Sequence, residues 1–117
     1  MEKNFKYINL EYLNEISSSI EFKKKIFYLF KKEIKDIENK MIISLENNNI
    51  DELAELAHKA KSTVSILGMK SIAVELKVLE SDIKKNIEID TYKKRINDFL
   101  ASCNSAIEEI EILEKHL

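Results

Sequence analysis

The chain has 117 residues, a length that suits one compact domain with a single core. It contains one glycine and no proline, whereas average composition at this length supplies about 8 and about 6, so turn-rich folds such as β-sandwiches, barrels and glycine-loop nucleotide folds are disfavoured. The 19 lysines and arginines are outnumbered by 21 aspartates and glutamates, a balance that gives no general basis for nucleic-acid binding. Apolar residues recur every three or four positions, which predicts an all-α protein.

The first predicted helix is short, over residues 10–16, with Leu10, Leu13 and Ile16 facing inward. A run of three serines then supplies side-chain oxygens that can cap the next helix. That second helix is long, because its apolar stripe continues for roughly six turns. The stripe consists of Phe22, Ile26, Phe30, Ile34, Ile37, Met41 and Leu45.

Three consecutive asparagines interrupt the second helix, and Asn49 followed by Glu52 predicts a capped third helix over residues 50–67. Gly68 ends or kinks that helix, because glycine alone has no penalty at positive φ. A fourth helix is expected over residues 69–86, and Asp90 is expected to cap a fifth. Their inward-facing residues are predicted to be Met69, Ile72, Ala73, Leu76, Leu79 and Ile83, followed by Tyr92, Ile96, Phe99, Cys103, Ala106, Ile110, Leu113 and Leu117.

The four long helices and their short connections predict an antiparallel up-down four-helix bundle, with the short N-terminal helix across one end. Residues 1–117 are expected to form this single domain. Cys103 is interpreted as a packing residue and, as the only cysteine, excludes an internal disulfide. The lysine-rich stretch at residues 23–32 is interpreted as the solvated edge of a helix. The apolar runs are too short for a signal peptide or a membrane span, so we expect a cytoplasmic monomer without membrane or nucleic-acid partners.

His58 is predicted to point away from the core, because at roughly 100° per residue the apolar residues expected to face inward all lie more than about 100° from it. These residues are Leu53, Leu56, Ala60, Val64 and Leu67. Ala54 and Ser62, one turn before and after it, are small, and Ser65 continues this cleared strip. A surface chosen for helix propensity would carry long side chains there. Lys61 would favour an anion on the ring, and phosphate is the obvious candidate. An incidental surface histidine is the simpler alternative, and the terminal His116 is interpreted in that way.

The segment from His58 to Gly68 resembles the signature of histidine-containing phosphotransfer (HPt) domains of bacterial multistep phosphorelays. That signature has a phosphorylatable histidine, a lysine three residues on, a small residue next and a glycine ten residues after the histidine. His58, Lys61 and Gly68 match it, and Ser62 stands where the family usually has glycine. The resemblance covers almost the whole chain, since residues 10–16 look like the family's capping helix and residues 53–57 like its approach to the histidine.

The resemblance implies that His58 accepts a phosphoryl group from a receiver-domain aspartyl phosphate and passes it to another receiver. Lys61 would hold the phosphoryl oxygens, and Ala54, Ser62 and Ser65 would form the docking surface. The partners would be response-regulator receivers and a hybrid histidine kinase. The Mg²⁺ and its acidic cluster would belong to the receiver, so no cofactor is expected here. Without a P-loop or glycine-rich nucleotide loop, the chain is expected to be a phosphocarrier and not a kinase.

In this family, a residue of the helix after the glycine often supports the phosphorylated ring. Spacing makes Glu80 and Lys84 the candidates here, and an ordinary exposed i,i+4 ion pair between them is the alternative. Gly68 is expected to have a structural role.

Three other functions are alternatives for the same residues. The dimerisation and phosphoacceptor domain of a histidine kinase typically has an acidic residue directly after the histidine and a proline soon after, whereas Lys59 follows here and proline is absent. A non-phosphorylated helical interaction module or scaffold could use the same face. A metal site formed by His58, Asp51 and Glu55 lacks a second nearby histidine.

Overall fold

The computed structural model describes residues 5–117, which form helices and connections without a β-strand. The all-α prediction is therefore confirmed for this part of the chain. The helices are α1 (Leu10–Ile16), α2 (Ile20–Glu46), α3 (Ile50–Ser65), α4 (Lys70–Lys85), the short 3₁₀ helix η1 (Ile89–Thr91) and α5 (Tyr92–Glu114).

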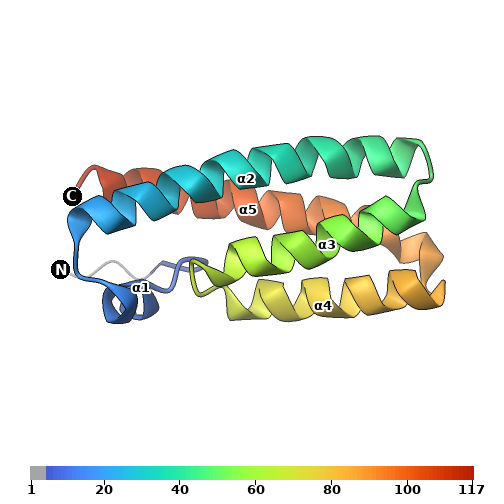
Figure 1. The fold of residues 1–117 in the computed structure, drawn as a ribbon, viewed down its shortest axis with the longest axis horizontal. Coiled ribbons are helices and arrows are strands. Elements are labelled where there is room, and N and C mark those ends of the chain that lie inside the picture. Colours follow the sequence, from blue (N-terminus) through green and yellow to red (C-terminus); the bar gives the residue numbers. More distant parts are fainter. Residues whose placement is uncertain (1–4) are drawn as a thin grey trace.

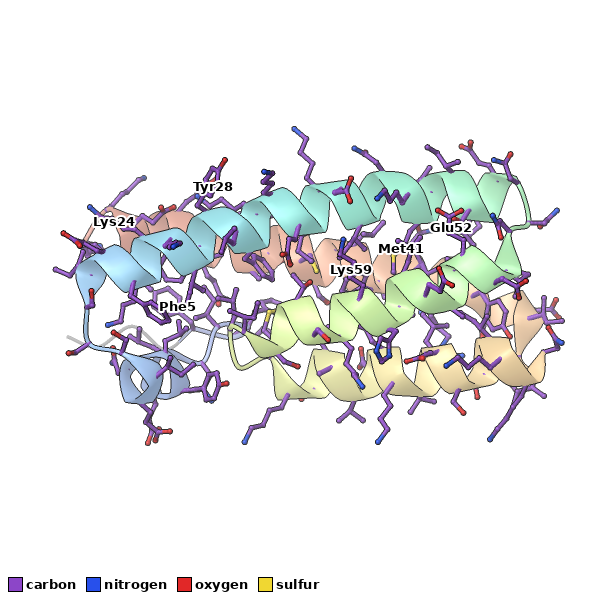
Figure 2. All side chains as sticks on the ribbon, in the orientation of Figure 1. Phe5, Lys24, Tyr28, Met41, Glu52 and Lys59 are labelled. Carbon is purple, nitrogen blue, oxygen red and sulfur yellow. The ribbon has the colours of Figure 1, made fainter. Side chains whose placement is uncertain are left out.

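The four long helices lie side by side along the length of the molecule, and each reverses the direction of the one before it (Figure 1). α3 packs against both α2 and α4, and α5 packs against the same two helices. α1 lies at the end of the molecule where α2 begins and where α3 turns into α4 (Figure 1). Charged side chains project from the outer faces, among them Lys24 of α2 and Lys59 of α3 (Figure 2).

The predicted starts of α2 and α3 are confirmed by their capping contacts. Ser19 Oγ accepts a hydrogen bond from the Phe22 backbone amide at 3.2 Å. Asn49 Oδ1 accepts one from the Glu52 amide at 3.2 Å, and Asn49 Nδ2 donates one to Glu52 Oε2 at 3.0 Å. The contacts to the Phe22 and Glu52 amides each satisfy a backbone donor that a helix start would otherwise leave unpaired.

The prediction that Asp90 caps α5 is wrong. Thr91 is the N-cap residue and makes no side-chain capping bond, while Asp90 lies inside the 3₁₀ turn. The connection between α4 and α5 is instead stabilised by the first residue of α5, because the Tyr92 hydroxyl donates to the carbonyl oxygens of Asp82 and Ile87. Because the 3₁₀ turn includes Asp90, the N-cap position of α5 falls one residue later than expected, at Thr91.

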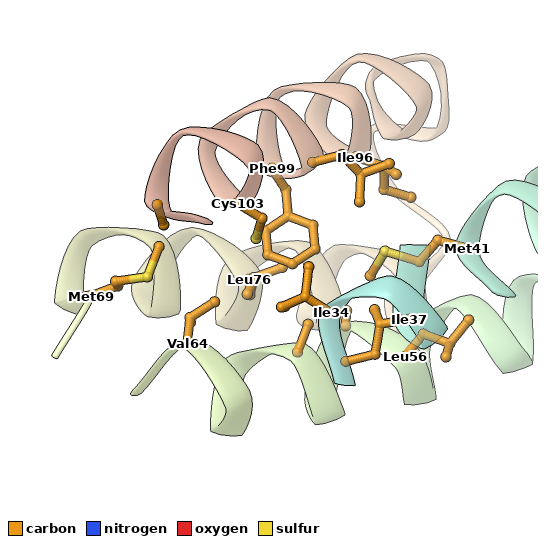
Figure 3. Close-up of a cluster of buried hydrophobic side chains, with 14 of the residues drawn as sticks. Ile34, Ile37, Met41, Leu56, Val64, Met69, Leu76, Ile96, Phe99 and Cys103 are labelled. Carbon is orange, nitrogen blue, oxygen red and sulfur yellow. The ribbon is translucent and has the colours of Figure 1, made fainter. Parts of the chain in front are cut away.

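The core runs between all four long helices, as predicted. Figure 3 shows Ile34 and Ile37 of α2, Leu76 of α4 and Phe99 of α5 pointing toward one another. All four are at most 4% exposed. Cys103 is fully buried beside them, and burial raises the pKa of its thiol to about 12. Its interpretation as a packing residue is therefore confirmed, since a reactive cysteine needs an accessible thiolate.

Two residues expected in the core near α1 are exposed. Ile16 is 44% exposed and Phe22 is 39% exposed, and Leu10 is only partly buried. Phe22 belongs to the first turn of α2, which extends past the end of α3 (Figure 1). A periodic stripe predicts the face of a helix but not where the neighbouring helix stops. The other predicted inward residues that are only partly buried, Ile26, Leu45, Ile72, Ala73, Leu113 and Leu117, pack against the core.

Gly68 lies in the turn between α3 and α4, where the start of α1 packs against it. Its φ is +71°, in the left-handed region, and a Cβ added there would lie 2.8 Å from Asn9 Cβ and 2.9 Å from Tyr12 Cδ2. The Asn9 backbone amide also donates to the Leu67 carbonyl at 3.0 Å. Glycine is thus required both by the backbone conformation and by the close approach of the segment that begins α1.

Gly68→Ala is expected to lower the free energy of unfolding by about 2 to 5 kcal/mol, combining a left-handed alanine with an overpacked contact. Urea unfolding monitored by circular dichroism measures this change. Asn86→Ala is the matched control, because Asn86 is also left-handed, with φ 56°, at the end of α4. Equal losses in the two variants would show that the contact of Gly68 with Asn9 and Tyr12 contributes nothing.

Candidate functional site

His58 lies in the middle of α3, where a continuous helix holds it on the outer surface. Its side chain is 61% exposed, as the sequence predicts. The ring nevertheless contacts α4, because His58 Nδ1 lies 3.0 Å from Glu80 Oε1. The two residues line a shallow groove between α3 and α4, together with Ala54, Glu55 and Lys84.

Glu80 has a partner on each carboxylate oxygen. While Oε1 faces His58, Oε2 accepts a hydrogen bond from Lys84 Nζ at 2.7 Å. The residue is only 9% exposed. The hydrogen bond from Lys84, aided by the contact with His58, lowers the pKa of the Glu80 carboxyl against the opposing effect of burial. Glu80 is therefore ionised at neutral pH.

The expected exposed ion pair between Glu80 and Lys84 is only half correct. The pair forms, and Lys84 is exposed, but the carboxylate lies in the groove and reaches His58. The burial of Glu80 was not predicted, although its neighbours on the helix surface, Leu76 and Ile83, both belong to the core. A residue between two such positions lies at the edge of the buried face.

The contact with Glu80 determines which nitrogen of the neutral His58 ring carries the proton. A carboxylate only accepts hydrogen bonds, so Nδ1 must be the donor. The lone pair of the neutral ring is then on Nε2, the other ring nitrogen. An exposed ring with a fixed tautomer is a competent nucleophile.

The docking residues expected on α3 differ in exposure. Ser62 and Ser65 are exposed, and Ser65 Oγ donates to the Lys61 carbonyl at 2.7 Å, so this hydroxyl is used within the helix. Ala54 is only 6% exposed and lines the groove, so its expected place on the open docking surface is corrected. Lys61 is half-buried one turn after His58, and no ion pair within residues 5–117 involves it.

The other candidate sites lie apart from this groove or lack the required ligands. His116 is exposed and lines a separate, larger hollow beside α1, with Tyr7, Asn14 and Met69 among its other lining residues. Within residues 5–117, no group of three or more histidine, cysteine, aspartate or glutamate side chains could hold a metal ion. No described helix is both long and apolar enough to cross a membrane.

Comparison with known proteins gives no match to a protein-family model, a curated protein or a solved structure. The functional argument therefore rests on the residues of the α3–α4 groove and on their contacts.

Proposed function

We propose that this chain is an HPt-type phosphocarrier, a single up-down four-helix bundle with a short N-terminal helix. His58 accepts a phosphoryl group from the aspartyl phosphate of one receiver domain and passes it to the aspartate of another. The observation that carries the proposal is the exposed ring of His58 held through Nδ1 by the carboxylate of Glu80. An incidental surface histidine has no need of a buried carboxylate at that position.

The transfer proceeds by attack of the Nε2 lone pair of the neutral ring on phosphorus. The N–P bond forms as the bond from phosphorus to the aspartate oxygen breaks, and the aspartate leaves as a carboxylate. The ring then carries a positive charge, while its Nδ1–H remains hydrogen-bonded to Glu80 Oε1. A charge-assisted hydrogen bond contributes about 1.5 to 3 kcal/mol when well formed, so Glu80 favours this charged product. Delivery to the second receiver reverses the same steps.

The remaining chemistry is supplied by the partners in this proposal. The receivers hold Mg²⁺ and the acidic residues that bind it, and a hybrid histidine kinase supplies the phosphoryl group at the start of the relay. The chain itself carries the group without ATP-dependent kinase activity, as a cytoplasmic monomer. Ser62 and Ser65 leave room on α3 for the receiver to approach His58.

The proposal is tested by mixing the purified chain with a panel of receiver domains that have been phosphorylated with labelled acetyl phosphate in the presence of Mg²⁺. We expect acid-labile, base-stable label on the chain, with ³¹P and ¹H NMR placing it on Nε2. A receiver that binds without transferring label would support the scaffold function instead. Label on Nδ1 would contradict the role given to Glu80.

Lys61→Ala is expected to slow phosphotransfer or shorten the phosphohistidine half-life by roughly ten- to a hundredfold, because a nearby ammonium stabilises the phosphoryl oxygens. The effect is smaller at high salt, where the charge is screened. Lys61→Arg should recover part of it, because charge is kept while geometry changes. Lys59→Ala is the matched control, since Lys59 is an exposed lysine of the same helix. Equal rates for all four proteins at low salt would remove Lys61 from the mechanism.

A further inference from the structure

Lys84, Glu80 and His58 form a continuous chain of polar contacts from the last turn of α4 to α3. Lys84 Nζ lies 2.7 Å from Glu80 Oε2, and Glu80 Oε1 lies 3.0 Å from His58 Nδ1. Each oxygen thus has a different donor. Because Lys84 holds Oε2, the carboxylate is oriented with Oε1 toward the ring.

Charged residues of both signs share the faces of α3 and α4 that carry His58 and Glu80. By their helical positions, the charged residues on this face are Asp51, Glu55 and Lys61 of α3 and Lys77, Glu80 and Lys84 of α4. Three are acidic and three are basic. Among these six residues, Glu80 is the one that forms an ion pair with the ring, and Lys84 is the one that forms an ion pair with Glu80.

Removing the ammonium of Lys84 would leave the poorly hydrated carboxylate of Glu80 with His58 as its remaining side-chain partner. A nearby carboxylate favours the charged form of an imidazole. A protonated imidazole has no lone pair on either nitrogen and cannot attack phosphorus. Without Lys84, the positive charge that pairs with Glu80 would therefore be a protonated His58 ring, which is no longer a nucleophile.

We propose that Lys84 is a positioning residue that acts through Glu80: it orients the carboxylate toward Nδ1 and balances its charge, so that the His58 ring stays neutral with Nε2 free. The relevance of this arrangement to phosphotransfer rests on the proposed function. The effect of Lys84 on the protonation of the His58 ring is independent of that function, because it is measured on the chain alone.

The test follows the His58 ring signals by NMR across pH in Lys84→Met, which keeps the side-chain length and removes the charge. We expect the midpoint of their titration to rise by about 0.5 to 1 pH unit, which corresponds to roughly three to ten times more protonated rings at a pH above the midpoint. Lys84→Arg should stay near wild type. Lys85→Met is the matched control, since it loses the same charge at an exposed neighbouring position that has no contact with Glu80.

A second background isolates the path through Glu80. In Glu80→Gln, the further change Lys84→Met should leave the midpoint nearly unchanged, because the charge that Lys84 balances is gone. Equal midpoints in Lys84→Met and Lys85→Met would overturn the proposal, as would a full shift in the Glu80→Gln background. A chain that shows the expected NMR shifts but accepts no label from any receiver would refute the proposed function and leave the role of Lys84 intact.

Discussion

His58→Gln is expected to reduce phosphoryl acceptance to the level of a blank reaction. Glutamine is similar in size to histidine, and its amide N–H groups can still donate to Glu80, but the amide nitrogen has no lone pair available for attack. The side chain of His58 is 61% exposed, so the helix does not depend on its packing. The measurement is label retained after transfer from a phosphorylated receiver in the presence of Mg²⁺.

His116→Gln is the control for this experiment, because His116 is the other histidine of the chain and is also exposed. It lies beyond the end of α5, without a buried carboxylate such as Glu80 among its described side-chain contacts. The His116→Gln variant should accept label at the wild-type rate, on His58. Label that persists in His58→Gln and disappears in His116→Gln would identify His116 as the phosphoacceptor and contradict the assignment to His58.

The direction in which His58 faces could be predicted from the sequence because it depends only on the helical period. Leu56, Ala60 and Val64 fix the buried side of α3, and His58 lies opposite to them. The capping contact between Asn49 and Glu52 is equally local, since both partners lie within one turn. Predictions of this kind need no knowledge of neighbouring helices.

The contact between His58 and Glu80 could not be predicted in the same way. It depends on the rotation of α4 about its axis and on its height relative to α3, and packing between the two helices sets both. Spacing identified Glu80 and Lys84 as candidates but could not decide whether the carboxylate faced water or the ring. The exposure of Phe22 and the 3₁₀ turn at Asp90 have a related cause, because each depends on where a neighbouring element begins or ends.

The second large effect is expected from substitutions of the small residues Ser62 and Ser65, which follow His58 on α3. Ser62 and Ser65 are exposed one and two turns beyond the ring, on the side from which a receiver would approach. The Ser65 hydroxyl already donates to the Lys61 carbonyl, so it is not free for chemistry. Alanine at either position should therefore leave transfer nearly normal.

Tryptophan at Ser62 or Ser65 should slow transfer from a receiver by on the order of a hundredfold, equivalent to about 2.7 kcal/mol, because its bulk clashes with the docking partner. Stability should change by only about 0.5 kcal/mol, as is usual for exposed positions. Ala101→Trp is the matched control, since Ala101 is a small exposed residue on α5. Phosphoramidate, a donor small enough to reach His58 past the indole, should label the tryptophan variants as it labels wild type. If receivers transfer equally well to the alanine and tryptophan variants, they do not dock over this part of α3. If phosphoramidate labelling also falls, the indole blocks the ring itself rather than the approach of a partner.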